Sequence, residues 1–277
     1  MRLTDALRQA AAAGLDRLDA QMLLLLALGR DLNHRAWLLA HDTDPMPDGA
    51  ATRYAELVRR RLAGEPVAYL AGAKAFFGLH LQVDPRVLVP RPDTETLVQW
   101  ALDMLAPPPA HPRFLDLGTG SGAIALAVKS QRPDVDVTAT DASTDALAVA
   151  RANAERLGLA VNFHAGSWLQ AVPDQHFDVI TSNPPYIADG DPHLAALGHE
   201  PLGALTSGPD GLDDIRELVT HAPTALAPGG WLLLEHGHDQ AATVRALLVQ
   251  QGFGQVSSRA DLAGIERCSG GIWPQKR

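Results

Sequence analysis

The feature that most constrains the fold of this chain is an alternation, after Pro112, of short apolar runs with longer stretches of helical periodicity. Parallel strands need a crossover connection, usually a helix, so this alternation is typical of a parallel sheet covered by helices. It predicts an α/β fold. The expected strands are residues 114–117, 135–140, 161–164, 177–181 and 231–235, the expected helices are residues 123–130, 143–157, 213–226 and 238–251, and two further strands are expected within residues 255–273.

The N-terminal part of the chain has a different pattern, without strand periodicity. Apolar residues recur there at spacings of three and four in two runs, residues 15–26 and 48–62. This predicts a small helical bundle at residues 1–72, ahead of an α/β domain at residues 93–277.

A β-hairpin linker is expected between these two parts, at residues 73–92. Loose alternation in residues 77–83 and the apolar run at residues 87–89 predict its two strands. Asp84-Pro85 predicts the turn between them.

Composition narrows the class of protein. With 277 residues, of which 46% are hydrophobic and 20% charged, the chain is long and apolar enough to bury its own core. Its 32 acidic and 23 basic residues give a net charge of −9, which opposes binding dominated by nucleic-acid phosphates. A single cysteine, Cys268, excludes an internal disulfide, and no apolar run approaches the ~20 residues that span a bilayer. We therefore expect a cytoplasmic protein that binds neither membranes nor, directly, nucleic acid.

A glycine-rich loop joins the first strand of the α/β domain to its first helix. It reads Gly118-Thr119-Gly120-Ser121-Gly122, and the helical pattern begins directly after it. Glycines allow a sharp turn and let a ligand reach main-chain N–H groups at the helix N-terminus. The loop therefore predicts a nucleotide-type binding site, although a glycine turn that only packs strand against helix would have the same sequence.

Asp141 supports the binding interpretation. It lies 19 residues after Gly122 at the end of the next strand, where a carboxylate accepts hydrogen bonds from ribose hydroxyls. Its alternative role is to cap the helix near Ser143. The glycine spacing is not that of a dinucleotide-binding loop, and the Lys-Ser/Thr of a P-loop is missing. With Asp116 before the glycines, the loop instead resembles the first motif of S-adenosylmethionine-dependent methyltransferases, which implies that the loop and Asp141 hold the methyl donor.

The tetrapeptide Asn183-Pro184-Pro185-Tyr186 follows the strand expected at residues 177–181. Its two prolines make the turn rigid and leave carbonyl groups free to accept hydrogen bonds. An amide or exocyclic aromatic nitrogen is a weak nucleophile because its lone pair is delocalised. If the Asn183 side-chain oxygen and the Pro184 carbonyl accept its two N–H bonds, they orient that lone pair toward a methyl donor. Tyr186 would supply an aromatic wall for a planar group.

This tetrapeptide is similar to the motif of methyltransferases that act on planar nitrogens. Their acceptors are adenine in DNA, guanine in ribosomal RNA and the side-chain amide of glutamine in proteins. The motif thus indicates the class of the acceptor atom and leaves the acceptor molecule open.

Several other segments resemble one family, the glutamine methyltransferases of peptide-chain release factors, and together they cover nearly the whole chain. The resemblance implies a helical domain that docks on the release factor, followed by a seven-stranded, Rossmann-like methyltransferase domain. It also implies direct methylation, from S-adenosylmethionine and without a metal, of the glutamine in the Gly-Gly-Gln loop of bacterial class I release factors. The matching segments are residues 64–70, 76–79, 87–95, 200–201, 204–205, 208–212 and 234–237.

The same resemblance implies roles for further residues. Trp168 would stack on the adenine of the donor, and Asn183 would contact both the donor and the substrate. The residues from Asn183 to Tyr186 would hold the glutamine. Ser167 stands where many family members carry an acidic residue, and without the resemblance Trp168 would fit the core equally well.

Two rival functions are weighed against this one. An amino-methyltransferase of adenine or guanine in nucleic acid would need a basic surface, and the cluster Arg59-Arg60-Arg61 is better explained as the solvated end of a helix. A binding protein that kept the fold without the activity would have a broken glycine loop or tetrapeptide, and both are intact.

Two polar features outside these motifs receive structural interpretations. Arg91 is either part of the site wall or, as we favour, a surface cation paired with Asp93 or Glu95. His236 and His238 have no evident third ligand nearby, so we expect no metal site there.

Overall fold

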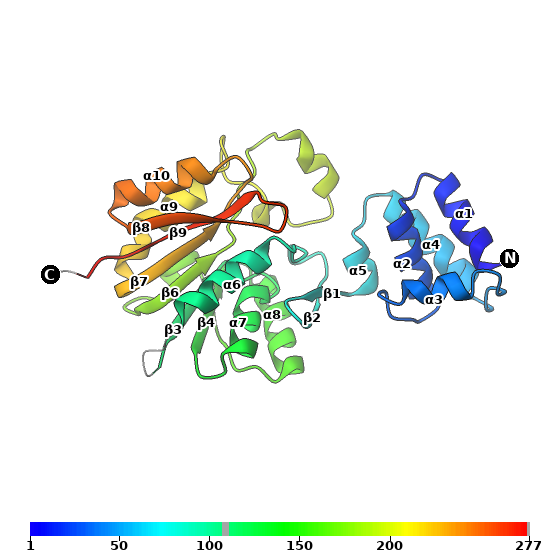
Figure 1. Cartoon of the computed structure of the whole chain (residues 1–277), viewed down its shortest axis with the longest axis horizontal. Helices are drawn as coiled ribbons and strands as arrows, with labels where there is room; N and C mark the ends of the chain where they lie inside the picture. Colours follow the sequence, from blue (N-terminus) through cyan, green and yellow to red (C-terminus); the bar gives the residue numbers. More distant parts are fainter. Residues whose placement is uncertain (107–110, 276–277) are drawn as a thin grey trace. The chain divides into compact units, whose positions relative to one another are not determined.

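The structure is a computed structural model that describes residues 1–106 and 111–275. It divides into two compact units (Figure 1). The first comprises Met1–Gly72 together with Ala196–His199, and the second comprises Ala73–Ala195 and Glu200–Arg277. Within the described ranges, no helix has the length and apolar character needed to cross a membrane.

The first unit is helical, as its apolar spacing predicts. Leu23, Leu24 and Leu25 are completely buried at its centre. The Asp16 side chain accepts from the backbone N–H of Leu18 at 2.7 Å and so caps the second helix. The helices are α1 (Leu3–Ala12), α2 (Arg17–Ala27), α3 (Arg35–Ala40), α4 (Ala50–Leu62) and α5 (Val67–Ala71).

The second unit begins with an antiparallel hairpin of β1 (Ala73–Phe76) and β2 (Leu79–Gln82). Its turn is formed by Phe77 and Gly78, which have φ values of 45° and 77°. Two successive residues with positive φ match the turn that fits the twist of a two-residue hairpin. This confirms a hairpin within residues 73–92, but the prediction of its turn at Asp84-Pro85 is wrong.

Residues 84–89 are held by side chains instead of strand pairing. Asp84 accepts from the Arg86 backbone N–H at 3.0 Å and from its guanidinium at 2.6 Å, which closes a local turn. The Val89 N–H donates to the Glu200 carboxylate at 3.0 Å. The apolar run at residues 87–89 thus reflects burial of Val87 and Val89 and not a strand.

The main sheet of the second unit has seven strands in the order β5-β4-β3-β6-β7-β9-β8, which confirms the predicted fold class. The strands from β3 to β7 run parallel, and β9 is antiparallel to both β7 and β8. The strands are β3 (Arg113–Leu117), β4 (Asp136–Asp141), β5 (Asn162–Ala165), β6 (Phe177–Ser182), β7 (Leu226–Glu235), β8 (Gly254–Ala260) and β9 (Glu266–Ile272).

Helices cover both faces of this sheet (Figure 1). Successive side chains of a strand point to opposite faces, so Phe114 of β3 packs in one core cluster and Leu115 and Leu117 in the other. The first cluster lies under α6 (Thr94–Met104), α7 (Ala123–Gln131) and α8 (Thr144–Leu157). The second lies under α9 (Asp213–His221) and α10 (Ala241–Gln251).

Some element boundaries differ from those expected. The helix predicted to reach residue 226 ends at His221 and continues as a short 3-10 turn, because Pro223 has no N–H to continue the helical ladder. Helix α10 ends at Gln251, as expected, and the φ of 102° at the following Gly252 suits a helix stop. The triple proline at residues 107–109, which predicts the end of α6, lies outside the described residues. The 3-10 turns are Trp168–Ala171, Pro192–Leu197, Leu202–Ala204 and Ala222–Thr224.

The strand order places the candidate functional residues together. The chain runs outward from β3 to β4 and β5, then returns to the other side of β3 as β6. The carboxyl ends of parallel strands at such a reversal form a crevice. Gly118 follows β3, Asp141 ends β4 and Asn183 follows β6, so the fold brings the predicted loops to one edge.

Candidate active site

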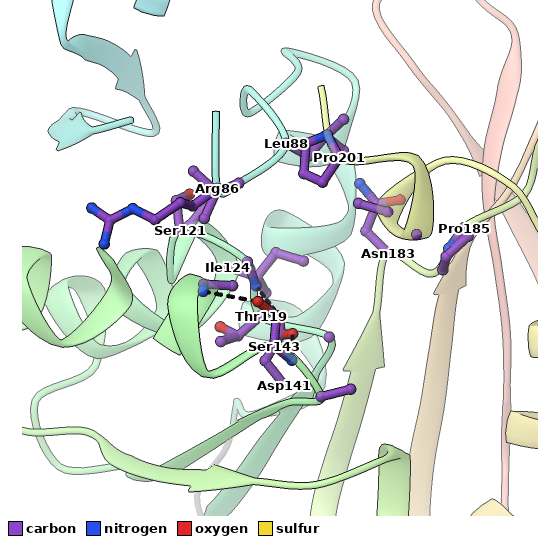
Figure 2. A pocket seen from close by; sticks show the side chains of 18 of the residues that line it. Arg86, Leu88, Thr119, Ser121, Ile124, Asp141, Ser143, Asn183, Pro185 and Pro201 are labelled. Atoms are coloured by element: carbon purple, nitrogen blue, oxygen red, sulfur yellow. Dashed lines mark hydrogen bonds between the residues drawn. The ribbon is translucent and has the colours of Figure 1, made fainter. Parts of the chain in front are cut away.

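A cavity of about 430 Å³ lies at this edge, entirely within the second unit (Figure 2). Figure 2 shows Thr119, Asp141 and Ser143 grouped in one part of it, and Asn183 and Pro185 in another. The predicted site residues that line it are Gly118, Thr119, Gly120, Ser121, Asp141, Trp168, Asn183 and Pro185, together with Ser167.

Three predicted site residues do not line the cavity. Gly122 caps α7, and a Cβ there would lie 2.9 Å from Leu126 Cδ1 of the same helix and 3.3 Å from Ala150 Cβ of α8, so this glycine serves the close packing of α7 and α8. Pro184 is buried. Tyr186 is half-buried and donates its hydroxyl to Glu235 at 3.4 Å.

The glycine loop is held from below by a buried carboxylate. Asp116 is completely buried and accepts from the Thr119 hydroxyl at 2.6 Å and the Thr181 hydroxyl at 3.2 Å. Burial raises its pKa to about 7, against the lowering effect of these donors and of the Ala125 N–H. Asp116 therefore fixes the loop from behind without facing the cavity.

Asp141 connects the second strand to the glycine loop. Its Oδ2 accepts from the Gly120 N–H at 2.9 Å and its Oδ1 from the Ser143 N–H at 2.8 Å. An ionised carboxylate has about four acceptor sites, so about two remain for a ligand. Burial raises the Asp141 pKa, and the two N–H donors oppose that rise. Capping belongs to Ser143, whose hydroxyl accepts from the Ala146 N–H.

Trp168 lies over the glycine loop. A Cβ on Gly118 would be 3.1 Å from Cζ3 of its indole, so a glycine is needed for the ring to approach this closely. Gly118 also has a φ of 69°, which L side chains rarely adopt. The indole packs partly against the second core cluster and partly lines the cavity. Trp168 is thus a core residue and a site residue at the same time, so the two interpretations do not exclude each other.

The side-chain amide of Asn183 has one atom with a hydrogen-bond partner and one without. Its Nδ2 donates to the Thr94 hydroxyl oxygen at 3.3 Å. Its Oδ1 is buried and has no hydrogen-bond partner in the described structure. A buried acceptor without a donor costs about 1–3 kcal/mol, so an orphaned oxygen in a cavity marks a place for a ligand N–H.

Arg91 does not pair as expected. It forms an ion pair with Glu200, whose side chain is only 2% exposed, while Glu95 accepts from the Phe77 N–H and Asp93 lies 3.4 Å from Arg267. Because Glu200 also holds the Val89 N–H, it ties the segment of residues 86–90 to the loop of residues 201–204, and both line the cavity. Arg91 therefore stabilises the cavity wall from outside.

Sequence reasoning missed several residues that line the cavity. They are Arg86, Val87, Leu88, Pro90, Thr94, Pro201, Gly203, Ala204 and Asp214. A signal was available for most of them, since residues 87–95, 200–201 and 204–205 lie in segments that resemble one family. Asp214 lies in the first turn of α9 and carries no such signal.

The paired histidines have structural partners. His236 is completely buried, with Nδ1 2.9 Å from the Gly237 carbonyl and Nε2 2.8 Å from the Ser269 hydroxyl. Burial lowers its pKa, which favours the neutral ring. Among the described residues, no group of three His, Cys, Asp or Glu side chains is arranged to hold a metal ion.

The residues present fit S-adenosylmethionine as the ligand of this cavity. Asp141 has acceptor capacity for ribose hydroxyls, Trp168 offers an aromatic face, and the glycines keep the floor free of side chains. Asn183 lines the same cavity, and its buried Oδ1 has no hydrogen-bond partner in the described structure.

Comparisons with known proteins show the class of protein to which this chain belongs. Residues 95–200 match the family model for the methyltransferase small domain, and residues 2–72 match the model for the PrmC N-terminal domain. A crystal structure of a methyltransferase from Pyrococcus furiosus covers 78% of this chain and 99% of its own with a TM-score of 0.55 at 24% identity, which shows the fold alone. Fold and site thus define an S-adenosylmethionine-dependent methyltransferase of the Rossmann-like class.

Curated relatives specify the family within this class. Release factor glutamine methyltransferase from Bordetella pertussis is 54% identical over 94% of this chain and 96% of its own length. The proteins of that name from Burkholderia pseudomallei and Salmonella typhimurium are 51% and 42% identical, over 95% and 97% of this chain and 94% and 96% of theirs. The chain belongs to the release factor glutamine methyltransferase family.

Proposed function

We propose that this protein transfers the methyl group of S-adenosylmethionine to the side-chain amide nitrogen of the glutamine in the Gly-Gly-Gln loop of bacterial class I release factors. The observation that carries the proposal is Asn183, which lines the same cavity as the glycine loop and Asp141 and has a buried Oδ1 without a hydrogen-bond partner in the described structure. The extent of similarity to named release factor glutamine methyltransferases supports the choice of glutamine as the acceptor.

The donor is held by the first part of the cavity. When bound, S-adenosylmethionine supplies a methyl group on a positively charged sulfur. Asp141 accepts from its ribose hydroxyls, Trp168 stacks on its adenine, and residues 118–121 give its amino-acid part access to the loop backbone. Gly122 acts in this site only indirectly, by fixing the start of α7.

The acceptor is held by the tetrapeptide. Asn183 Oδ1 accepts one N–H bond of the glutamine amide, and Pro185 lines the cavity near Asn183. The Pro184 carbonyl accepts the other N–H bond, although the buried Pro184 does not itself line the cavity. Holding both N–H bonds favours a pyramidal nitrogen whose lone pair points at the methyl group, and stabilises the positive charge that develops there. In this transfer the nitrogen–carbon bond would form as the carbon–sulfur bond breaks, S-adenosylhomocysteine would leave with the bonding electron pair, and the amide nitrogen would lose one proton to water.

We assign the domains accordingly. Residues 1–72 dock on the release factor, residues 73–92 link the units, and residues 93–277 carry out the transfer. We place the activity in the cytoplasm, a compartment compatible with the free, buried Cys268.

Methylation of nucleic acid is not favoured. The cluster Arg59-Arg60-Arg61 does not offer free positive charge, since its members pair with Glu56, Glu65 and Asp19 respectively. A phosphate backbone would have to compete with these carboxylates, against a net charge of −9.

The direct test is incubation of the purified protein with a purified class I release factor and labelled S-adenosylmethionine, followed by mass spectrometry of the loop peptide. We expect one methyl group, on the glutamine. A loop that stays unmethylated while naked ribosomal RNA or DNA becomes labelled would overturn the assignment.

A further inference from the structure

A side chain from outside the cavity contacts the end of the tetrapeptide at residues 183–186. Gln240 directly precedes α10 and does not line the cavity. Its Nε2 donates to the Tyr186 carbonyl at 3.0 Å, across 54 positions of sequence, and to the Asp210 carbonyl at 3.3 Å. Its Oε1 accepts from the Gly237 N–H at 2.8 Å. One amide group thus joins the tetrapeptide to two other segments of the second unit.

The orientation of this amide is fixed by its partners. A backbone N–H can only donate and a carbonyl can only accept, so Gln240 must turn its oxygen toward Gly237 and its NH₂ toward the two carbonyls. An amide rotated by half a turn would place its oxygen against two carbonyl oxygens and its NH₂ against an N–H. The hydrogen bond from Gln240 to Tyr186 therefore has a single possible direction.

The Tyr186 carbonyl is also closely packed against the backbone of a loop. A Cβ at Gly211 would lie 2.3 Å from the Tyr186 oxygen and 3.0 Å from Gln240 Nε2. Gly211 also has a φ of 73°, which L side chains rarely adopt. The loop thus covers this carbonyl at a distance that only glycine allows, and the side chain of Gln240 supplies the hydrogen bond that a covered carbonyl needs.

The composition of the tetrapeptide makes the hydrogen bonds of Tyr186 important. Its two prolines have no N–H, so within the tetrapeptide only Asn183 and Tyr186 can donate from the backbone. The Tyr186 N–H donates to the Leu205 carbonyl at 3.2 Å. With the bond from Gln240, both backbone polar groups of Tyr186 are held, by two segments distant from it in sequence.

On the proposed function, the tetrapeptide must present the Asn183 oxygen and the Pro184 carbonyl to one amide group at the same time. Misplacement of a reacting group by about 1 Å can cost about 100-fold in rate. We propose that Gln240 is a positioning residue for the methyl transfer: it binds the Tyr186 carbonyl and thereby holds both acceptor groups in the geometry that the glutamine needs. Neither Gln240 nor the residues that it bonds line the cavity, so the methyl donor does not contact this anchor.

The first test compares Gln240→Ala with Gln251→Ala in the full-length protein, with a release factor as substrate. Gln251, at the other end of α10, is a matched control because its Nε2 also donates to a distant carbonyl, that of Thr220, at 3.1 Å. Neither Gln251 nor Thr220 contacts the tetrapeptide or lines the cavity. Each variant loses hydrogen bonds to the backbone, so both should unfold at a temperature about 1–6 °C lower.

The kinetic constants should separate the two variants. In Gln240→Ala kcat should fall at least about tenfold, while the Kd for S-adenosylmethionine, measured by calorimetry, stays within about twofold. Gln251→Ala should keep kcat within about twofold of the unaltered protein. Equal losses of kcat in the two variants, or a loss of donor affinity in Gln240→Ala that matches its loss of kcat, would refute the proposal.

The second test uses Gln240→Glu, which keeps the size of the side chain and the acceptor for the Gly237 N–H. An oxygen replaces the NH₂, so an ionised carboxylate faces the Tyr186 and Asp210 carbonyls. At about pH 8 kcat should therefore fall at least as far as in Gln240→Ala. If Gln240→Glu keeps the kcat of the unaltered protein, the bond to Tyr186 does not position the tetrapeptide.

A third measurement does not depend on activity, and so separates failure of this inference from failure of the proposed function. The ¹³C shift of the Tyr186 carbonyl and the ¹⁵N shift of Ile187, which shares its peptide bond, report the hydrogen bond that this carbonyl accepts. Both shifts should change in Gln240→Ala and stay constant in Gln251→Ala. Unchanged shifts in Gln240→Ala would refute the anchor, whatever the acceptor molecule proves to be.

Discussion

The close approach of Trp168 to Gly118 can be tested with two alanine substitutions in one loop. Gly118→Ala places a Cβ 3.1 Å from the indole and keeps a backbone φ of 69°, while Gly122→Ala places a Cβ 2.9 Å from Leu126 Cδ1 at a φ of 85°. Gly118 lines the cavity and Gly122 does not. Both substitutions therefore strain the loop, but only Gly118→Ala also changes the surface that a ligand would contact.

The expected losses follow from these geometries. An alanine with left-handed φ costs about 1–2 kcal/mol, so each variant should unfold at a temperature about 2–8 °C lower, with Gly122→Ala at least as affected. In Gly118→Ala the indole must also move by a few tenths of an ångström, because the contact is tighter than ordinary packing allows. An aromatic stacking contact contributes about 0.5–1.5 kcal/mol, so the Kd for S-adenosylmethionine should rise about two- to tenfold.

The assay is calorimetric titration with S-adenosylmethionine, paired with thermal unfolding of both variants. In Gly122→Ala the Kd should stay within about twofold of the unaltered protein, although its stability is lower. If both variants keep their affinity, Trp168 does not stack on the donor. If Gly122→Ala loses more affinity than Gly118→Ala, the order inferred from the cavity lining is wrong.

Three further substitutions test the remaining assignments. Asp141→Ala removes the carboxylate that we propose binds the ribose. Calorimetry should show donor binding weakened about 10- to 100-fold, since hydrogen bonds to charged groups contribute about 1.5–3 kcal/mol. An unchanged Kd would show that Asp141 does not bind the ribose. Asn183→Ala should lower kcat about 100-fold or more in the release-factor assay with little change in donor Kd, and equal losses of both would make Asn183 chiefly a donor ligand. Arg91→Ala leaves the buried carboxylate of Glu200 with the Val89 N–H as its donor among the described residues. The free energy of unfolding in urea should fall by about 1–2 kcal/mol, a modest loss for a buried carboxylate because Arg91 is itself partly exposed. Its control is Arg216→Ala, whose exposed pair with Asp210 should contribute less than about 1 kcal/mol, and equal effects of the two would contradict the structural role of Glu200.

The parallel α/β architecture was predictable because its signal is local. A buried strand is an apolar run, and a crossover helix has its own periodicity, so neither depends on knowing the partner. The hairpin was misplaced for the opposite reason. Val87 and Val89 look like a strand because they are buried, but they are buried by a loop, and the turn lies at Phe77 and Gly78.

The site residues also fall into those that the sequence could indicate and those that only the structure could place. Gly118, Asp141 and Asn183 could be found because each directly follows or ends a recognisable strand, and a parallel sheet brings such ends together. Thr94, which touches Asn183 across 89 positions of sequence, could be placed in a family-like segment but not in the cavity.

The sequence by itself determined the order of strands and helices, the loop that floors the cavity and the tetrapeptide that indicates a planar nitrogen. Only the tertiary structure decided which polar groups pair. Arg91 lies two residues from Asp93 yet binds Glu200, 109 positions away, because the fold buries that carboxylate beside it. Burial makes a charge or a hydrogen-bonding group require a partner, and burial is set by the packing of the whole domain and not by neighbours along the chain.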